Sequence, residues 1–314
     1  MYDFKKTLNL IEKEIDILTV GELLIDMIST EYGDDFQSST YQKHFGGSPA
    51  NIALNTKKLG LNSLIVGAVG KDGLGDFIIN TVKNAGVETK YINRVDYSTS
   101  MVLVTKSKAT PIPIFYRDAD YHIYYSKKIE EIVKNSKIIH FSCWPISKSP
   151  ARETIEKIID IAKKNNTLIC FDPNYHPMIW EKGHQAIDYI KWIIGNVDII
   201  KPSEDDAERI FGKDLPQNQI EKFLKLGAKL VIMTLGKDGA LMSNGKETIS
   251  LNSVATEVID TTGAGDAFWS GFYAGLVRHY KVLESLQMGL KASAIKLKTV
   301  GALLKEVQFE DLLE

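Results

Sequence analysis

The sequence predicts an α/β fold in which a central, mainly parallel β-sheet lies between two layers of helices. Short apolar runs rich in β-branched residues alternate with longer amphipathic runs along most of the chain. Several short runs, such as IDILTV at 15–20 and SLIVGAV at 63–69, are almost continuously apolar, which is typical of strands covered on both faces. Two β-prone stretches, 25–45 and 97–118, lack a helical pattern and are too long for simple loops, so they predict a small accessory β-sheet.

The predicted elements alternate in chain order, which favours parallel strands connected by helices. We expect strands at 15–20, 63–69, 137–142, 167–171, 197–200 and 229–235. We expect helices at 48–59, 73–85, 150–165, 184–194, 203–211, 217–226, 264–279 and 283–297. The core domain is then expected to comprise residues 1–24, 46–96 and 119–314, and the accessory sheet residues 25–45 and 97–118.

The composition excludes several classes of protein. The 314 residues are 44% hydrophobic and 25% charged, and the net charge of −2 provides no basic field for nucleic acid or an anionic membrane. No apolar run approaches the roughly 18–20 residues of a membrane-spanning helix. The two cysteines, Cys143 and Cys170, lie in apolar runs and predict buried free thiols, which suits a reducing cytoplasm. Residues 1–14 mix charges throughout and receive no functional prediction.

The first glycine-rich segment, HFGGSPANIALNTKKLG at 44–60, is typical of a loop entering a helix. Ser48 is expected to cap the helix, with Pro49 at its first position. Gly46 and Gly47 allow a closer backbone approach than side chains would permit, and Asn51 would then direct its amide toward the occupant of the loop. A tight strand-to-helix turn with a polar cap explains this stretch equally well.

A second segment, GAVGKDGLGDF at 67–77, does not place G-x-G-x-x-G between a strand and a helix. The segment is interpreted as a structural turn. The absence of the dinucleotide-binding fingerprint argues against a dehydrogenase. The chain also lacks G-x-x-x-x-G-K-[ST], which excludes a P-loop enzyme.

The segment IDTTGAGDAFWSGFYAGL at 259–276 carries the clearest chemical signal. Gly263, Ala264 and Gly265 leave backbone N–H groups accessible at the start of a predicted helix, where the helix dipole also favours an anion such as phosphate. Asp266 follows them and can accept a proton from an attacking hydroxyl. This combination is typical of phosphoryl transfer, although a glycine-rich helix cap is the simpler alternative.

TLGKDGALM at 234–242 supplies a hydroxyl and two glycines in a turn after a strand. Thr234, Gly236 and Gly239 could contact the phosphates of a nucleotide. The same residues fit a hairpin turn, and both interpretations stay open.

With both segments in view, the chain resembles the ribokinase-like (PfkB) carbohydrate kinase family from about residue 15 to the C-terminus. The resemblance rests on FGGSPANIALNTKKLGLNSLIVGAVGKDGLG at 45–75 and DTTGAGDAFWSGFYAGL at 260–276. IFYRDAD at 114–120 and DPNYHPMIW at 172–180 are most similar to the fructokinase and 2-keto-3-deoxygluconate kinase branches.

The resemblance implies a three-layer α/β/α domain with a β-sheet lid, and transfer of the γ-phosphate of ATP to a sugar hydroxyl with Mg²⁺. It implies that Asp266 is the base, with Gly263, Ala264 and Gly265 as the anion hole. The implied sugar-binding residues are Asp26, Gly46, Gly47, Asn51, Arg117, Asn174 and His176. The implied nucleotide-binding residues are Lys201, Ser203, Thr234, Gly236, Gly239, Ala292 and Ser293. Asp260 and Thr262 occupy positions that hold an activating monovalent cation such as K⁺ in many relatives.

Two departures from the family pattern affect the expected site. The [N/S]-x-x-E motif linked to Mg²⁺ and phosphate reads Ser203-Glu204-Asp205-Asp206, so Asp206 stands in place of the usual Glu. Asp206 through a water, or Glu204 in part, would then serve the metal. His176 stands where an Arg is common, and this favours a neutral hexose over an acid sugar because a neutral imidazole holds a carboxylate less well than a bidentate Arg.

These observations predict an ATP-dependent fructokinase that forms fructose 6-phosphate. The alternatives are the same chemistry on 2-keto-3-deoxygluconate, ribose or a nucleoside, and a non-catalytic sugar- or nucleotide-binding protein on the same fold. Open strand edges of the accessory sheet favour a homodimer formed through the lid. The four tryptophans fit the core better than a sugar platform, with Trp144 and Trp180 as the candidates for exceptions.

Overall fold

Within the described residues, nine strands form the central sheet of the computed structural model, which describes residues 2–33, 36–106, 113–180 and 185–313. The strands lie in the order β13-β12-β11-β10-β9-β8-β1-β4-β5. All neighbouring pairs are parallel except β11–β12 and β12–β13. Their bounds are β1 Ile15–Val20, β4 Ser63–Gly70, β5 Ile92–Val95, β8 Ser136–Ser142, β9 Leu168–Asp172, β10 Ile199–Ile200, β11 Leu230–Thr234, β12 Ala240–Ser243 and β13 Thr248–Leu251.

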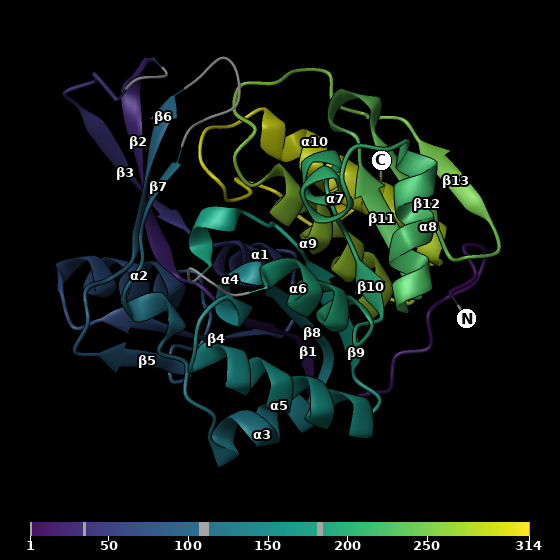
Figure 1. Ribbon diagram of the computed structural model, residues 1–314, viewed down its shortest axis with the longest axis horizontal. Helices are drawn as coiled ribbons and strands as arrows, with labels where there is room; N and C mark the ends of the chain where they lie inside the picture. Colours follow the sequence, from purple (N-terminus) through teal and green to yellow (C-terminus); the bar gives the residue numbers. More distant parts are fainter. Residues whose placement is uncertain (1, 34–35, 107–112, 181–184, 314) are drawn as a thin grey trace.

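Helices cover both faces of this sheet and form the predicted three layers (Figure 1). One face packs against α1 (Ser48–Lys58), α9 (Ala264–Val277) and α10 (Val282–Leu297). The other packs against α3 (Lys127–Lys134), α5 (Ala151–Lys164), α6 (Ala186–Ile194), α7 (Glu204–Phe211) and α8 (Pro216–Leu226). α2 (Gly73–Asn84) packs on β4, and the short α4 (Cys143–Ile146) follows β8.

The sheet strands are apolar on both faces because each face meets a layer of helices. In β8, Ile138 belongs to the apolar cluster built with α9 and α10, whereas Ile139 and Phe141 belong to the cluster built with α3 and α5. Successive side chains of a strand point to opposite faces, so this division explains the nearly continuous apolar runs in the sequence.

A second, four-stranded sheet stands beside the core (Figure 1). Its order is β3-β2-β6-β7, with β2 and β6 parallel and the outer pairs antiparallel. The bounds are β2 Leu24–Tyr32, β3 Tyr41–Gly46, β6 Met101–Lys106 and β7 Pro113–Tyr116. These strands occupy the two stretches for which an accessory sheet was expected; positions 34–35 and 107–112 of those stretches lie outside the described residues.

All six predicted strands and all eight predicted helices are present, with end points shifted by at most a few residues; position 184, the expected start of one helix, lies outside the described residues. The sequence did not predict β5, β12, β13, α3 and α4. The three strands and α4 have only four residues each, too few for a periodic pattern to stand out. TLGKDGALM proves to be the turn between antiparallel β11 and β12, with Gly239 in a left-handed conformation, φ 89°.

The two cysteines are buried free thiols, as predicted. In the part of the chain that the structure describes, no helix combines the length and apolarity that crossing a bilayer requires.

The N-terminal segment, for which the sequence predicted no role, packs against the core. Phe4 is 1% exposed and Leu10 is buried in the same apolar cluster as α9 and α10. The segment also accepts backbone hydrogen bonds from Val282 and Leu283 at the start of α10. It therefore acts as a strap that covers the C-terminal helices.

We predict that Phe4→Ala lowers the free energy of unfolding by about 3–5 kcal/mol, because the aromatic ring leaves a cavity in this packed cluster. Chemical denaturation monitored by circular dichroism would measure the loss. Ile11→Ala is the matched control, since Ile11 lies in the same segment but is 47% exposed. Equal effects of the two substitutions would show that the strap does not contribute to the core.

Candidate active site

A cavity of about 400 Å³ opens at the carboxyl ends of β1, β9, β10 and β11, the edge at which parallel α/β sheets bind ligands. Segments from across the chain meet there, including the first turn of α9 and strands β2 and β6 of the second sheet. The residues that line it are Glu22, Leu24, Asp26, Gly47, Ser48, Asn51, Val102, Trp144, Asp172, Asn174, Lys201, Ser203, Asp206, Thr234, Thr261, Thr262, Gly263, Ala264, Gly265 and Asp266.

Gly263, Ala264 and Gly265 form one wall of the cavity, and we call these three residues the anion loop. Gly263 has φ 75°, and a Cβ there would lie 2.5 Å from the carbonyl oxygen of Ala302, so the position requires glycine. α9 begins at Ala264 and directs its free N–H groups and positive dipole end into the cavity. The ammonium of Lys201 lies 3.3 Å from the Cβ position of Gly265, which adds a positive charge beside the loop.

Asp266 lies in the first turn of α9, and its carboxylate receives hydrogen bonds on both oxygens. Ser48 Oγ donates to Oδ1 at 2.6 Å, and Asn51 Nδ2 donates to Oδ2 at 2.9 Å. Burial raises the pKa of the Asp266 carboxyl to about 6, while these two hydrogen bonds act in the opposite direction. The group is therefore largely ionised at neutral pH and suited to accept a proton.

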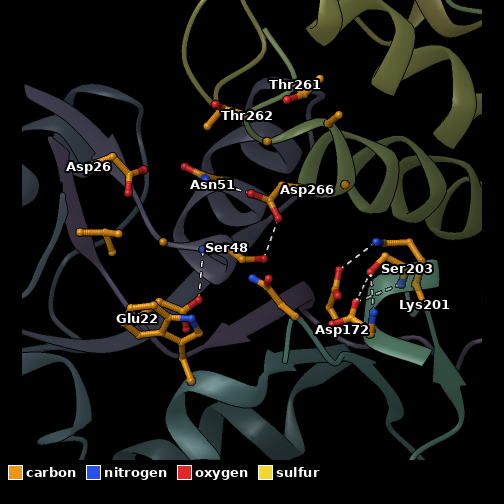
Figure 2. A pocket seen from close by; sticks show the side chains of 18 of the residues that line it. Glu22, Asp26, Ser48, Asn51, Asp172, Lys201, Ser203, Thr261, Thr262 and Asp266 are labelled. Carbon is orange, nitrogen blue, oxygen red and sulfur yellow. Dashed lines mark hydrogen bonds and ion pairs between the residues drawn. The ribbon is translucent and has the colours of Figure 1, made fainter. Parts of the chain in front are cut away.

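Ser48 has a different role from the predicted helix cap. The N-cap of α1 is Gly47, and the Ser48 hydroxyl points to Asp266 instead (Figure 2). Glu22 takes over part of the capping, because its Oε1 accepts the Ser48 N–H at 3.2 Å. Burial raises the pKa of Glu22 to about 8, and Ser142 donates a further hydrogen bond to it. Sequence reasoning missed Glu22, whose only signal was a lone acid in an apolar run.

Four of the sugar-binding residues that the resemblance implied, Asp26, Gly46, Gly47 and Asn51, lie close together. Asp26 on β2 lies across the cavity from Asp266 (Figure 2), and burial, followed by the charge of Asp266, raises the pKa of Asp26 to about 7. A Cβ at Gly46 would lie 2.2 Å from Asp26 Oδ2, and one at Gly47 would lie 2.3 Å from the Glu22 carbonyl oxygen. The buried Asn51 Oδ1 has no hydrogen-bond partner among the described residues, so it is available to a ligand hydroxyl.

The opposite wall carries a buried ion pair. Lys201 Nζ lies 2.9 Å from Asp172 Oδ2 (Figure 2). The same oxygen accepts a hydrogen bond from Trp269 Nε1 at 2.8 Å. Sequence analysis proposed Lys201 but missed Asp172. Thr234, at the end of β11, lies on the same wall.

Asp206, the departure from the family pattern, completes a capping box at the start of α7. Its Oδ2 accepts the N–H and hydroxyl of Ser203, and its Oδ1 accepts the Tyr175 N–H at 2.7 Å. Burial and then the charge of Asp172 raise the pKa of Asp206 above its usual range. Glu204 is exposed and does not line the cavity, so it does not substitute for Asp206.

Among the described residues, no three Asp, Glu, His or Cys side chains form a metal-binding cluster. Mg²⁺ that arrives on phosphates needs only one or two protein carboxylates and keeps several waters. Asp172 and Asp206 both line the cavity and fit that requirement.

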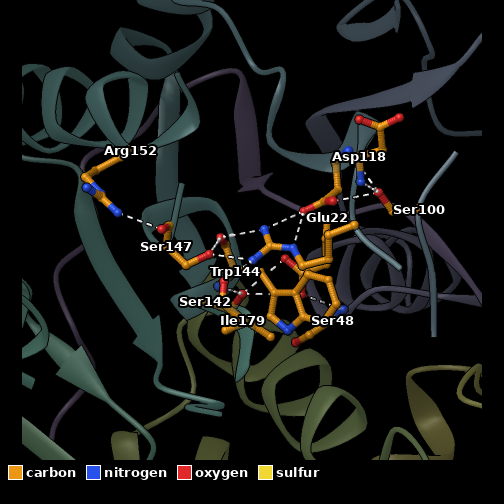
Figure 3. A network of polar contacts seen from close by, with 11 residues as sticks. Glu22, Ser48, Ser100, Asp118, Ser142, Trp144, Ser147, Arg152 and Ile179 are labelled. Atoms are coloured by element: carbon orange, nitrogen blue, oxygen red, sulfur yellow. Dashed lines mark hydrogen bonds and ion pairs between the residues drawn. The ribbon is translucent and has the colours of Figure 1, made fainter. Parts of the chain in front are cut away.

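Arg117 is placed away from the cavity, which corrects the expectation that it reaches the sugar. Its side chain is 4% exposed, and its Nε and Nη2 both donate to Asp120 Oδ2, at 3.0 and 2.6 Å. Nη1 donates to Ser147 Oγ and to the Ile179 carbonyl, and Nη2 also donates to the Trp144 carbonyl (Figure 3). All five donors are therefore in use. The guanidinium lies 4.5 Å from the Trp144 ring centroid and holds in place the tryptophan that lines the cavity.

Asn174 and His176 follow β9, but only Asn174 lines the cavity. The His176 ring packs 5.0 Å from the Phe115 ring and accepts the Met178 N–H at Nδ1. Burial, then the charge of Arg209, lowers the pKa of His176, so it is neutral as expected but not in the predicted place.

Four predicted nucleotide contacts also lie outside the cavity. Gly236 and Gly239 form the β11–β12 turn, where a Cβ at Gly239 would lie 2.1 Å from the Leu251 carbonyl oxygen. Ala292 is buried against Gly271 of α9, and Ser293 lies next to it on α10. Helix packing and turn geometry explain these residues in the present structure.

A side chain of the protein lies beside the predicted monovalent-cation site. Thr262 lines the cavity, but the Asp260 carboxylate accepts the N–H groups of Thr262 and Gly301. The Asp260 carbonyl oxygen accepts a hydrogen bond from the ammonium of Lys296 at 2.9 Å. A lysine ammonium therefore lies beside the position predicted for a K⁺ ion, and the K⁺ site stays a prediction.

Of the tryptophans, Trp144 lines the cavity, whereas Trp180 and Trp269 are buried in apolar clusters. Trp192 is 48% exposed, so the expectation of a core position is wrong for it.

Comparison with known proteins identifies the family of the chain. Residues 14–307 match the model of the "pfkB family carbohydrate kinase". An ATP-dependent 6-phosphofructokinase from Thermoanaerobacterium thermosaccharolyticum is 62% identical over 304 residues, covering 97% of this chain and 94% of the relative. Among solved structures, the fructokinase of Halothermothrix orenii is 37% identical with a TM-score of 0.80, covering 89% of this chain and 98% of that chain. A fructokinase of Xylella fastidiosa with bound ATP has a TM-score of 0.84 at 21% identity, over 95% of this chain and 96% of that chain, and so supports the fold alone.

We predict that Ser48→Ala moves the acidic limb of the pH profile of kcat/KM upward by about 0.5–1 pH unit. The Ser48 hydroxyl favours the ionised form of Asp266, so its removal raises the pKa of that group. Activity that needs the carboxylate is present above this pKa and is lost as the pH falls through it. ATP turnover measured from pH 5 to 8 tests the shift, with Ser39→Ala at an exposed position as the control. An unmoved limb would mean that Ser48 does not influence the ionisation of Asp266.

Proposed function

This chain belongs to the pfkB family of carbohydrate kinases, and we propose that it transfers the γ-phosphate of ATP to a primary hydroxyl of a fructose-type sugar. The observation that carries the proposed mechanism is the position of the Asp266 carboxylate beside the anion loop in one cavity. A base and an anion-stabilising loop in this arrangement are what phosphoryl transfer requires of a protein. Membership of a kinase family does not favour the alternative of a non-catalytic binding protein.

In the proposed reaction, the acceptor oxygen forms a bond to the γ-phosphorus while the bond to the β,γ-bridging oxygen breaks. The hydroxyl proton passes to Asp266, and ADP leaves with the bridging oxygen. The anion loop, the dipole of α9 and Lys201 stabilise the negative charge on the transferred group. Ser48 and Asn51 hold the carboxylate in the orientation that faces the acceptor.

Mg²⁺ bound to the ATP phosphates would neutralise charge on the transferred and leaving groups. Asp206 and Asp172 are the carboxylates that would hold it, through water. Asp206 is already fixed by Ser203 and Tyr175, which favours an outer position over direct ligation.

We propose fructose 6-phosphate as the acceptor. Support comes from the relative of 62% identity, which is named an ATP-dependent 6-phosphofructokinase and aligns over nearly the whole chain. Asp26 and the free Oδ1 of Asn51 would then bind the ring hydroxyls. The acceptor hydroxyl would lie between Asp266 and the anion loop.

Fructose itself, the acceptor predicted from the sequence, is the second candidate. The fructokinase of Halothermothrix orenii supports it, and so does the charge of the cavity. Glu22, Asp26 and Asp266 surround the sugar side, whereas Lys201 is paired with Asp172 on the opposite wall. This arrangement suits a neutral sugar in the conformation described here.

We further propose that the second sheet, within residues 25–45 and 97–118, is the lid of a core formed by 1–24, 46–96 and 119–314. Asp26 and Val102 reach the cavity from this sheet, so its closure would exclude water from an activated phosphate.

The edge strands β3 and β7 would allow two lids to pair in a homodimer. Sedimentation as a monomer at working concentration would contradict the homodimer. Two observations support the cytoplasm as the location of the protein. The proposed reaction consumes ATP, and both cysteines are buried free thiols.

We expect Asp266→Asn to lower kcat by about 10²–10⁴-fold, because the amide cannot accept the acceptor proton. The affinity for the sugar should change little, since the base contributes to the chemical step. Steady-state kinetics and calorimetric titration separate the two effects. Asp160→Asn, which removes an exposed carboxylate from α5, is the control. Normal turnover of Asp266→Asn would refute the assigned base.

The acceptor is tested by coupled measurement of ADP release with Mg²⁺ and, separately, fructose 6-phosphate, fructose, ribose, 2-keto-3-deoxygluconate and adenosine. We expect the highest kcat/KM with fructose 6-phosphate. A higher value with fructose would establish the second candidate, with the mechanism unchanged. A preference for any of the other three would refute both acceptors.

A further inference from the structure

A buried lysine joins the segment that leads into the anion loop to the segment that follows α10. Lys296, in the last turn of α10, is 0% exposed. Its Nζ donates hydrogen bonds to the carbonyl oxygen of Asp260 at 2.9 Å and to that of Thr299 at 3.0 Å. Residues 260 and 299 lie far apart in sequence, so the ammonium links two segments that meet only in the folded protein.

The same two segments are joined at further points. Asp260 Oδ2 accepts the Gly301 N–H at 2.8 Å, and Oδ1 accepts the Thr262 N–H at 2.9 Å. A Cβ at Gly263 would lie 2.5 Å from the Ala302 carbonyl oxygen, so the backbones are in direct contact. The conformation of the anion loop therefore depends on how the Asp260 and Thr299 segments are held together.

Two carbonyl oxygens that converge on one point need a hydrogen-bond donor or a cation between them, and a positive charge satisfies both most strongly. Their dipoles place partial negative charge at the same position, and buried carbonyl groups need a partner. Convergent backbone carbonyls are also the ligands that replace the hydration shell of K⁺ in proteins. In this chain the partner is the Lys296 ammonium.

The charge of Lys296 is balanced locally. Burial lowers the pKa of the Lys296 ammonium, and the nearby Asp260 carboxylate acts in the opposite direction. Burial would raise the pKa of Asp260, but the hydrogen bonds from Thr262 and Gly301, together with the charge of Lys296, leave it below its usual range. The contacts of Asp260 therefore favour its ionised form, and its negative charge opposes the effect of burial on Lys296.

We propose that the Lys296 ammonium takes the place of a monovalent metal ion at this position, so that the anion loop keeps its phosphate-binding conformation without potassium. The resemblance to the family implied an activating K⁺ at Asp260 and Thr262. The Lys296 side chain now occupies the space in front of the Asp260 and Thr299 carbonyls.

A K⁺ ion cannot share this position with Lys296. It would have to take the same two carbonyl oxygens while lying within a few ångströms of an ammonium, and the repulsion of two like charges at such a distance is large in a buried site. It would also lose the two ligands that the ammonium holds. The two cations are therefore mutually exclusive.

The first experiment measures the wild-type protein in chloride salts of potassium, sodium, ammonium and choline at one ionic strength of about 100 mM. We expect the rate of ADP release to differ by less than about twofold among the salts, because no cation binds with preference for the active conformation. The melting temperature should also be the same in potassium and choline. A rate or a melting temperature that rises specifically and saturably with potassium would overturn the proposal.

The second experiment replaces the lysine. Lys296→Ala opens a space in front of the two carbonyls, and in choline chloride we expect its rate to fall about tenfold or more, as is typical of losing a charge-assisted hydrogen bond. Potassium or ammonium should restore a large part of that rate and raise the melting temperature of this variant, because an ion that binds only the folded state stabilises it. Lys296→Met removes the charge but keeps the bulk, so it should stay impaired in every salt.

Lys298→Ala is the matched control, because it removes an exposed lysine two residues further along the chain. It should behave as the wild type in every salt. An Lys296→Ala protein that keeps the wild-type rate in choline would overturn the proposal. The wild-type salt series keeps the proposal testable if a Lys296 variant does not fold.

The rate measurements rest on the proposed function, whereas the melting temperatures do not. A chain that consumes no ATP with any acceptor would refute the proposed acceptors, yet the potassium dependence of melting would still test the role of Lys296.

Discussion

Two hydrogen bonds to the carboxylate of Asp266 join parts of the chain that are 215 and 218 residues apart in sequence. Ser48 and Asn51 lie in the first turn of α1, and Asp266 lies in the first turn of α9, so the bonds fix the starts of two helices against each other. Each helix is preceded by an N-cap glycine, Gly47 or Gly263, at which a Cβ would collide with backbone atoms. This junction places the anion loop and orients the Asp266 carboxylate in the cavity.

The cavity brings several buried carboxyl groups together, and positive groups lie beside them. Burial raises the pKa of Glu22, Asp26, Asp206 and Asp266, because carboxylates lose hydration there. Lys201 and the positive end of α9 offset part of that charge next to the anion loop. Carboxyl groups therefore lie on one side of the cavity and positive groups on the other, an arrangement that fits the proposed pairing of a sugar hydroxyl with a separate phosphate donor.

The sequence was sufficient for features with local signals and insufficient for those created by tertiary contacts. The alternation of strands and helices and the GAGD segment predicted the sheet and placed Asp266 in the cavity. Arg117 carried the right chemistry for a sugar phosphate, but Asp120 and three other acceptors take all its donors. Lys296 gave no signal because its partners are backbone carbonyls, which the amino-acid sequence does not distinguish.

A tethered ammonium and a free metal ion impose different constraints on the loop that they hold. The occupancy of a site by a free metal ion depends on the concentration of that ion, whereas the ammonium of Lys296 is always present. A metal ion accepts many oxygen ligands, whereas the ammonium offers at most three directed hydrogens. Its charge also depends on burial, which lowers its pKa, and on Asp260, which supports the charged form. The Asp260 carboxylate must therefore do two things at once: it keeps Lys296 charged, and it orders the backbone of Thr262 and Gly301 on either side. Because Gly263 directly follows Thr262 and lies close to Ala302, the same carboxylate links the Lys296 ammonium to the backbone of the anion loop.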